Sequence, residues 1–297
     1  MGHDIMVLTD RHKIDAFFNR VRKIIGVQNE NIQAGLDFEF DYNFKTKTHD
    51  MALGQIALAS TSDTMHTNTQ TVIALFDFRL FNPSQKKTFI TDILINPTVL
   101  KILHGSESLD LPALRLFIKN DKLFKIFLSQ MTDTRFLCEA YNVLRLKYPD
   151  NWAGSQYVYD KKCGIYNALY STRTITKQEF DKLNSIQVDY RVRWSISKLS
   201  NTQITYAAAD VMFLRNLLKS YTVLLGCNMI KKVNIAYGLS MLHRMGITQD
   251  ASTGTSTASI VTQNTIVKSN TAVLEFTFKD LLQIDYLRKP LTMLYPL

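Results

Sequence analysis

The segment Ile32–Asp41 places acidic residues inside an otherwise apolar stretch, and this constrains the fold more than any other feature of the sequence. From Leu36 onward, apolar and acidic residues alternate, which predicts a β-strand with two different faces. Asp37 and Glu39 are two residues apart, so a strand projects both carboxylates from the same face. Such neighbours raise each other's pKa unless a cation offsets their charge, and hard divalent cations prefer carboxylate oxygens. The alternative is an ordinary solvated strand face, on which Asp41 shares the register.

The segments around this strand predict a sheet covered by helices. A helix is expected over Asp10–Ile25, where apolar residues recur every three or four positions and Asp10 provides an N-cap. Strands at residues 52–60 and 71–78 would continue an antiparallel meander. The later elements are expected to be a helix at 91–98, a strand at 99–104, a helix at 111–117, a strand at 127–132, a helix at 133–148 and a mostly helical region at 163–225.

This order of elements predicts an α/β protein with a mixed five-stranded sheet, three antiparallel strands and then two parallel ones, flanked by helices. We expect one domain over residues 1–225 and a C-terminal extension over residues 226–297. Residues from about 250 to 272 are rich in Ser, Thr, Asn and Gln, which is typical of a linker, a long loop or a weak polar hairpin. Leu274–Leu297 regains apolar periodicity and predicts a helix that ends before Pro290.

A second pair of polar residues belongs to a predicted helix late in the chain. Ser200 and Gln203 fit a capping box that opens this helix near Asn201. Tyr206 and Asp210 are four residues apart, so the helix projects both from one side. As an isolated pair they could equally be a partly buried tyrosine and a surface acid.

A further acid, Asp110, follows a short apolar strand and stands where the next helix begins. The helix dipole favours an acid at this position, so a capping role competes with a metal-binding role, although the two are compatible. His104 lies just upstream and is expected to be a structural histidine with its hydrogen bonds satisfied, not a metal ligand.

Together these three segments resemble the motifs of the DEDD superfamily of 3′→5′ exonucleases, in the tyrosine-bearing branch that includes ribonuclease D and the Werner-type exonucleases. The family's Asp-x-Glu, His…Asp-Leu and Tyr-x-x-x-Asp motifs correspond to Asp37–Glu39, His104–Leu111 and Tyr206–Asp210. The resemblance covers roughly residues 10–225. Weaker similarities lie at Ala52–Ala57, Asp133–Thr134 and Gly164–Leu169.

Two positions depart from the family pattern. The second motif holds one extra residue between His104 and Asp110, which makes Glu107 a rival for the metal-facing acid, although the following Leu111 favours Asp110. In the third motif the family's Arg-Pro is replaced by Ser197-Lys198. Lys198 keeps a positive charge but lacks the planar fork of arginine, so a phosphate or structural contact would be weaker.

The resemblance implies a ribonuclease H-like fold and a metal-dependent 3′→5′ exonuclease. Such an enzyme releases nucleotides from the single-stranded 3′ end of RNA or DNA by two-metal-ion phosphodiester hydrolysis, with Mg²⁺ or Mn²⁺ as cofactors. By resemblance, Asp37 bridges both ions, Glu39 and Asp210 complete the site of one ion, and Asp110 serves the other. Tyr206 orients the attacking water. The alternative is a catalytically weak or inactive relative that binds nucleic acid or acts as a scaffold.

The basic charge of the chain suits a polyanionic partner. The formal net charge is +9 over 297 residues, and a cationic surface gathers phosphates and releases their counterions on binding. Plain solubility explains the same charge equally well. The candidate cationic contacts to a nucleic acid are Lys45, Lys47, Lys161, Lys162, Arg191 and Arg193.

The cysteine content and the apolar runs bear on the cellular location. Cys138, Cys163 and Cys227 are far apart and odd in number, so neither a zinc site nor a disulfide framework is expected. A reducing intracellular compartment, cytoplasm or nucleus, is the default expectation, and secretion is not expected. A membrane span is not expected either, because the chain has no run of about 18 apolar residues.

Overall fold

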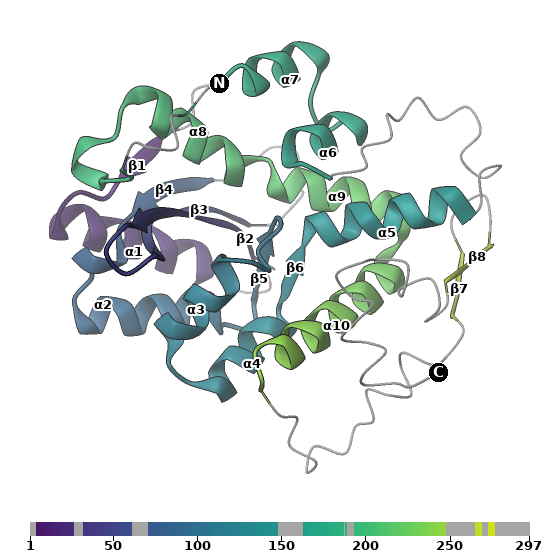
Figure 1. Ribbon diagram of the computed structural model, residues 1–297, viewed down its shortest axis with the longest axis horizontal. Helices are drawn as coiled ribbons and strands as arrows, with labels where there is room; N and C mark the ends of the chain where they lie inside the picture. The colour runs from purple at the N-terminus through teal and green to yellow at the C-terminus, as the bar shows by residue number, and fades with distance from the viewer. Residues whose placement is uncertain are drawn as a thin grey trace. The chain divides into compact units, whose positions relative to one another are not determined.

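The computed structural model describes residues 4–26, 32–60, 71–147, 163–186, 188, 193–247, 265–268 and 273–276. The chain forms two compact units (Figure 1). Unit 1 comprises Met1–Thr132 and Gln178–Arg215, and unit 2 comprises Asp133–Lys177 and Asn216–Leu297. The expected domains at 1–225 and 226–297 stay a prediction, because the compact units reflect proximity and not independent folding.

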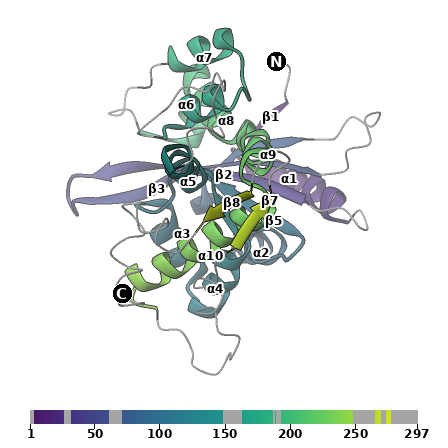
Figure 2. The ribbon, with the colours of Figure 1, turned by 90° about the vertical axis from the view of Figure 1, so that its right-hand side faces the viewer.

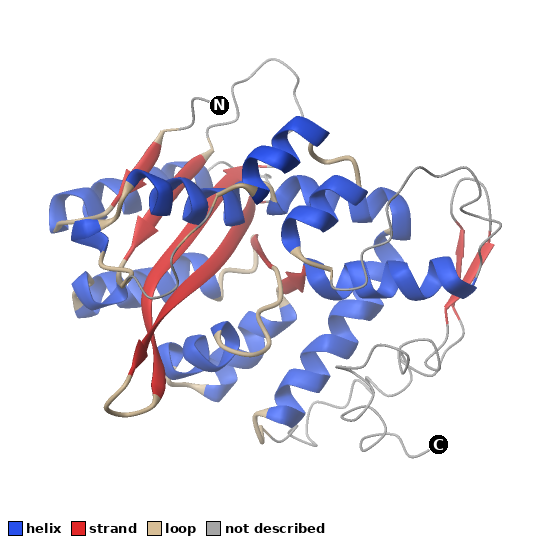
Figure 3. Ribbon diagram, turned by 45° about the horizontal axis from the view of Figure 1, so that its top comes forward, coloured by secondary structure: helices blue, strands red, loops and turns tan. Residues whose placement is uncertain are grey.

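A mixed six-stranded sheet, in the order β1-β4-β3-β2-β5-β6, forms the framework of unit 1 (Figure 3). The strands are β1 (Ile5–Val7), β2 (Ile32–Asn43), β3 (Thr48–Ser60), β4 (Val72–Phe76), β5 (Val99–Leu103) and β6 (Met131–Asp133). β3 is antiparallel to both β2 and β4, whereas β5 is parallel to β2 and β1 is parallel to β4. The expected mixed sheet is confirmed, and β1 is a sixth strand that the sequence analysis did not predict.

Helices flank this sheet and make up most of the described residues of unit 2. Those within unit 1 are α1 (Arg11–Ile25), α2 (Pro83–Thr88), α3 (Asp110–Ile118), α4 (Asp121–Ser129) and α8 (Asn201–Met212). Those within unit 2 are α5 (Thr134–Lys147), α6 (Ile165–Ser171) and α10 (Cys227–Arg244). The helices α7 (Lys177–Asn184) and α9 (Leu214–Leu225) cross the unit boundaries. Three shorter helical segments are the 3-10 helices η1 (Phe78–Leu80) and η4 (Ile196–Lys198) and the π-helix η2 (Phe89–Leu94).

Aromatic side chains fill the core beneath the central strands. The Phe78 ring packs 4.9 Å from that of Phe76 and 4.1 Å from that of Phe117, measured between centroids. Gly54 of β3 is paired with Phe38 of β2 and with Phe76 of β4. A side chain at Gly54 would collide with the Phe76 ring, so this position needs a glycine.

Two expected boundaries in unit 1 are wrong. The helix expected at 91–98 is replaced by a helical stretch that begins at Pro83, because Asn82 and Gln85 form a capping box, and that ends with η2 at Leu94. The strand expected at 127–132 begins only at Met131. Residues up to Ser129 belong to α4, whose N-cap is Asn120.

The C-terminal extension contains a two-stranded ribbon. β7 (Thr265–Lys268) pairs antiparallel with β8 (Val273–Phe276). Only β7 lies within the Ser/Thr-rich segment at 250–272, so the hairpin alternative for that segment agrees in part. The helix expected from Leu274 is wrong over 274–276, since these residues are in β8. The rest of Leu274–Leu297 lies outside the described residues.

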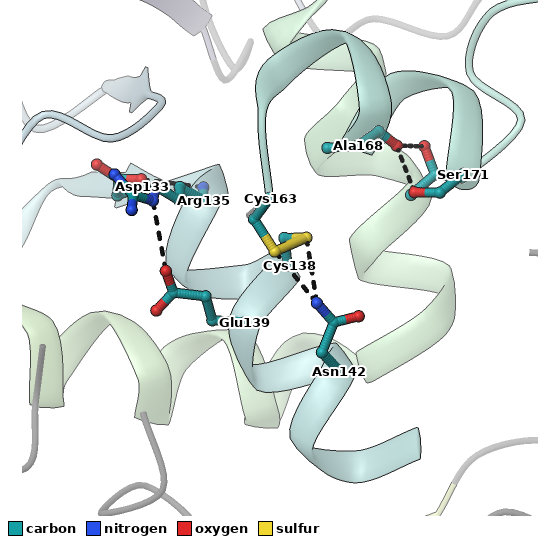
Figure 4. Close-up of a disulfide and its surroundings, with 9 residues drawn as sticks. Asp133, Arg135, Cys138, Glu139, Asn142, Cys163, Ala168 and Ser171 are labelled. Atoms are coloured by element: carbon teal, nitrogen blue, oxygen red, sulfur yellow. Dashed lines mark hydrogen bonds and ion pairs between the residues drawn. A yellow bond between two sulfur atoms is a disulfide. The ribbon is translucent and has the colours of Figure 1, made fainter. Parts of the chain in front are cut away.

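The expectation that the cysteines form no disulfide is wrong. Cys138 of α5 is bonded to Cys163, which precedes α6, and the Asn142 side-chain amide donates to the Cys163 sulfur at 3.3 Å (Figure 4). The bond closes a loop with a sequence separation of 25. Loop-closure entropy suggests that such a bond stabilises the fold by about 3 kcal/mol. Cys227 is a free, exposed thiol.

Among the described helices, none has the length and apolar character needed to span a membrane.

Candidate metal and active site

Three carboxylates from β2 and α8 meet at one place in unit 1. One oxygen each from Asp37, Glu39 and Asp210 lies within 4.8 Å of the others. Asp210 is buried, and the two β2 acids are half-buried. Three carboxylates this close form a donor set for a hard divalent cation, which prefers such oxygens and neutralises their charge.

A glycine on β2 allows the close approach of α8. Gly35 lies two residues before Asp37 and therefore on the same face of the strand. A Cβ atom at Gly35 would lie 2.7 Å from the carbonyl oxygen of Val211, which leaves no room for a side chain. Val211 directly follows Asp210. The absence of a side chain at Gly35 thus lets α8 carry the Asp210 carboxylate to the strand acids.

The start of α8 determines which of its residues face the sheet. The predicted capping box is present: the Ser200 hydroxyl accepts from the Gln203 amide at 3.2 Å, and the Gln203 side chain accepts from the Ser200 amide at 3.0 Å. One helical turn separates Tyr206 from Asp210, as predicted. The half-buried Tyr206 ring lies 6.2 Å from the ring of Trp194, between centroids.

The acids of the cluster have raised pKa values, as expected of carboxyls crowded together in a protein interior. Burial raises the pKa of Asp37 to about 7, against a lowering contribution from a hydrogen bond to the Phe38 amide. Burial, together with the charges of Asp37 and Asp210, raises the pKa of Glu39 to about 9. Without a cation, protons therefore compete for these oxygens at neutral pH.

One polar residue beside the cluster, Gln55, was not predicted as a site residue, although it belongs to the similar segment Ala52–Ala57. It is fully buried on β3 and is paired directly with Asp37 in the ladder. Its side-chain nitrogen donates to the Glu39 carboxylate at 3.4 Å, and its side-chain oxygen has no hydrogen-bond partner among the residues that the structure describes. A glutamine in a buried segment, Gly54–Ile56, was the available signal.

The other candidate acids are not members of this three-carboxylate cluster. Asp110 is the first residue of α3 and is buried, but it does not belong to the three-carboxylate cluster. Its rival Glu107 is buried as well, and it too lies outside the cluster. Asp41 lies on the same strand face, but its carboxylate accepts a hydrogen bond from the Trp194 amide at 2.9 Å. It therefore holds the segment before α8 against β2.

The candidate cationic contacts are only partly described. Lys45, Lys47, Arg193 and Lys198 are exposed. The other three candidates, Lys161, Lys162 and Arg191, lie outside the described residues.

Known proteins resemble this chain over much of its length. No protein-family model matches it. Uncharacterized protein L533 of Acanthamoeba polyphaga mimivirus is 28% identical over 224 residues, which is 70% of this chain but only 40% of that relative. Escherichia coli RNase D superposes with a TM-score of 0.49 at 18% identity. The match covers 84% of this chain and 52% of the RNase D chain.

Two structures of Trypanosoma brucei RNase D superpose more closely. One has a TM-score of 0.52 at 17% identity and covers 86% of this chain and 76% of its own. The GMP complex has a TM-score of 0.52 at 16% identity and covers 97% and 71%, respectively. These likenesses concern the fold, and assignment to the tyrosine branch stays a prediction. The chain has a ribonuclease H-like fold similar to that of RNase D.

Proposed function

We propose that this protein is a metal-dependent 3′→5′ exonuclease that releases nucleotides from the single-stranded 3′ end of RNA or DNA. The observation that carries the proposal is the convergence of Asp37, Glu39 and Asp210 within 4.8 Å on an exonuclease-type fold. Raised pKa values at Asp37 and Glu39 support it, because they indicate a site whose charge needs a cation. The T. brucei RNase D structure with GMP adds that a protein of this fold binds a nucleotide.

In this proposal the three clustered carboxylates would hold a divalent cation, Mg²⁺ or Mn²⁺, and Asp37 would also help to hold a second one. When bound, such cations supply Lewis acidity and lower the pKa of water. Tyr206 orients the attacking water through its hydroxyl, since a phenol with an ordinary pKa of about 10 is a weak base. Asp110 would hold the second cation from the start of α3, and Glu39 would contact the terminal 3′-hydroxyl of the substrate.

The test uses 5′-labelled RNA and DNA oligonucleotides incubated with the full chain and Mn²⁺ or Mg²⁺. We expect a ladder that shortens from the 3′ end, disappears in EDTA and is absent with Asp37→Ala. Asp41→Asn is the matched control, because it lies on the same strand face and keeps its acceptor for the Trp194 amide. Retained binding without shortening would favour an inactive nucleic-acid-binding or scaffold protein instead.

A further inference from the structure

The paired ends of β2 and β3 project beyond the rest of the sheet (Figure 2). The β2–β3 ladder runs from Ile32↔Ser60 to Asn43↔Thr48. In contrast, β5 pairs with β2 only up to Gly35, and β4 pairs with β3 only from Gly54 onward. Beyond Glu39 the two strands thus form a two-stranded ribbon, which ends in a turn over 44–47. We call residues Tyr42–His49 the hairpin tip.

Exposed aromatic side chains gather at the hairpin tip. Phe44 is 83% exposed and Tyr42 is 44% exposed. Their rings pack edge to face with centroids 4.9 Å apart, and the His49 ring lies 5.2 Å from that of Tyr42. Because Phe44 is mostly solvated, it gains little from burial, and a cluster of exposed rings indicates a contact surface.

Unpaired positive charge lies beside these rings. Lys45 and Lys47 are exposed, and neither forms an ion pair with a described residue. The two nearest acids along the chain are already engaged. Asp50 accepts from the Asn43 side chain and the Thr48 hydroxyl at 3.1 Å each, and Asp41 accepts from the Trp194 amide at 2.9 Å. Aromatic faces next to free lysines match the chemistry of a single-stranded nucleic acid, whose bases stack and whose phosphates carry negative charge.

The hairpin tip is continuous with the carboxylate site along β2. Seven residues separate Asp37 from Phe44, which is about 23 Å in an extended strand. A stacked nucleic-acid strand rises about 3.4 Å per nucleotide, so this distance corresponds to roughly seven nucleotides. By strand alternation, the side chain of Tyr42 points to the face opposite that of Asp37. Isolated two-stranded ribbons twist strongly, however, and this twist rotates the tip relative to the face that carries Asp37. Phe44 lies in the turn beyond the ladder, where strand alternation no longer applies.

We propose that the hairpin tip binds the upstream part of a single-stranded RNA or DNA whose 3′ end lies at the carboxylates. Tyr42 and Phe44 stack with bases, while Lys45 and Lys47 contact phosphates. This inference rests on the proposed function and extends it, because it adds a dependence on substrate length. A strand of roughly seven nucleotides or more reaches the tip, and a dinucleotide does not.

The experiment compares wild type with the double variant Tyr42→Ala/Phe44→Ala. Affinity for a fluorescent twelve-nucleotide oligouridine or oligothymidine is measured by anisotropy in EDTA. Hydrolysis of the dinucleotide of the same base is measured with Mn²⁺. Stacking losses predict that twelve-mer affinity falls about tenfold or more in the variant, while the dinucleotide rate stays within twofold. Leu116→Ala, which truncates an exposed side chain on α3, is the matched control and should change neither.

Unchanged twelve-mer affinity in the double variant would overturn the inference. So would an equal loss for the dinucleotide, which would indicate a disturbed active site. If the variant lost retention on anionic phosphatidylserine vesicles but kept its oligonucleotide affinity, the tip would be a membrane contact and the inference would also fail. A wild type that hydrolyses neither substrate, combined with weaker twelve-mer binding by the variant, would reject the proposed function and support the hairpin contact.

Discussion

The two ends of the β2–β3 strand pair carry opposite chemistry. At one end, strands β4 and β5 flank the pair and helix α8 packs against it. There β2 contributes Asp37 and Glu39 to the cluster with Asp210. Where the pair runs free of the sheet, it exposes Tyr42 and Phe44. Burial raises the pKa values of the acids and favours a cation, whereas exposure leaves aromatic rings free for a ligand. In the proposed function, one strand pair therefore places catalysis at one end and substrate binding at the other.

The largest effect is expected from neutralising the acidic end. Asp210→Asn keeps the size of a buried side chain but removes one charge from the cluster. Metal-ion stabilisation of the transition state amounts to several kcal/mol, so hydrolysis should fall by about 10³-fold or more. The measurement is the single-turnover rate on a twelve-mer with saturating Mn²⁺. Binding of the same strand in EDTA should be retained, and a joint loss of binding and rate would contradict the separation of the two ends.

A smaller effect is expected from the glutamine beside the cluster. Gln55→Leu removes the donor that contacts Glu39 at 3.4 Å without introducing a new buried polar group. Partners of metal ligands typically contribute 10- to 100-fold to metal affinity, so the Mn²⁺ concentration at half-maximal rate should rise by about this factor.

The control for this variant is Gln85→Leu, which removes another buried glutamine, one that donates to Asp15 on α1. It should lower the melting temperature without moving the Mn²⁺ midpoint. If both variants shifted the midpoint equally, Gln55 would act through general stability and not through Glu39.

The raised pKa values predict a pH dependence of the metal-free protein. Asp37 and Glu39 bind protons more tightly in the folded chain than in the unfolded one, where carboxyl pKa values are about 4. Their contribution to stability is therefore present at low pH and is lost as the pH rises through about 7 and about 9. The melting temperature in EDTA should fall by a few degrees over this window, at about 2–4 °C per kcal/mol.

Two additions sharpen this measurement. Glu39→Gln should flatten the upper part of the pH profile, and Mg²⁺ should raise the melting temperature most at alkaline pH, where both carboxyls are ionised. A profile that rises from pH 7 to pH 9 in EDTA would show that the carboxylates are held by another cation of the protein.

The smallest effect is expected at the cationic part of the hairpin tip. Each phosphate contact to a single strand contributes about 0.7 to the slope of log affinity against log salt concentration. Lys45→Ala/Lys47→Ala should therefore reduce the magnitude of this slope by about 1.4 for a twelve-mer. Lys122→Ala/Lys125→Ala on α4 is the control pair. An unchanged slope in the tip variant would leave the aromatic rings as the sole contact there.

Much of unit 1 could be predicted from sequence because its elements carry local signals. The alternation of β2, the capping box of α8 and the Asp10 N-cap of α1, which accepts from the Lys13 amide at 3.0 Å, are all present as expected. The placement of Asp37 and Glu39 on the same strand face followed from strand geometry. Their meeting with Asp210 followed only from the family resemblance, since no local pattern relates β2 to α8.

The features that sequence reasoning missed depend on tertiary contacts or on very short segments. β1 has three residues, too few for periodicity to identify. Phe127 and Leu128 were assigned to a strand because they continue an apolar run, which is compatible with either a strand or a buried helix. They belong to α4, whose first turn is stabilised by the Asn120 N-cap. The bond between Cys138 and Cys163 requires α5 and the segment before α6 to meet, which spacing alone does not reveal.

The most direct test of the central claim is the identity of the products from one linear oligonucleotide and from a circle of the same sequence. With Mn²⁺, the account predicts that wild type releases nucleoside 5′-monophosphates one at a time from the 3′ end of the linear strand and leaves the circle intact, as followed by mass spectrometry. An intact linear strand, or cleavage of the circle, would contradict the assignment of a 3′→5′ exonuclease to the Asp37, Glu39 and Asp210 site.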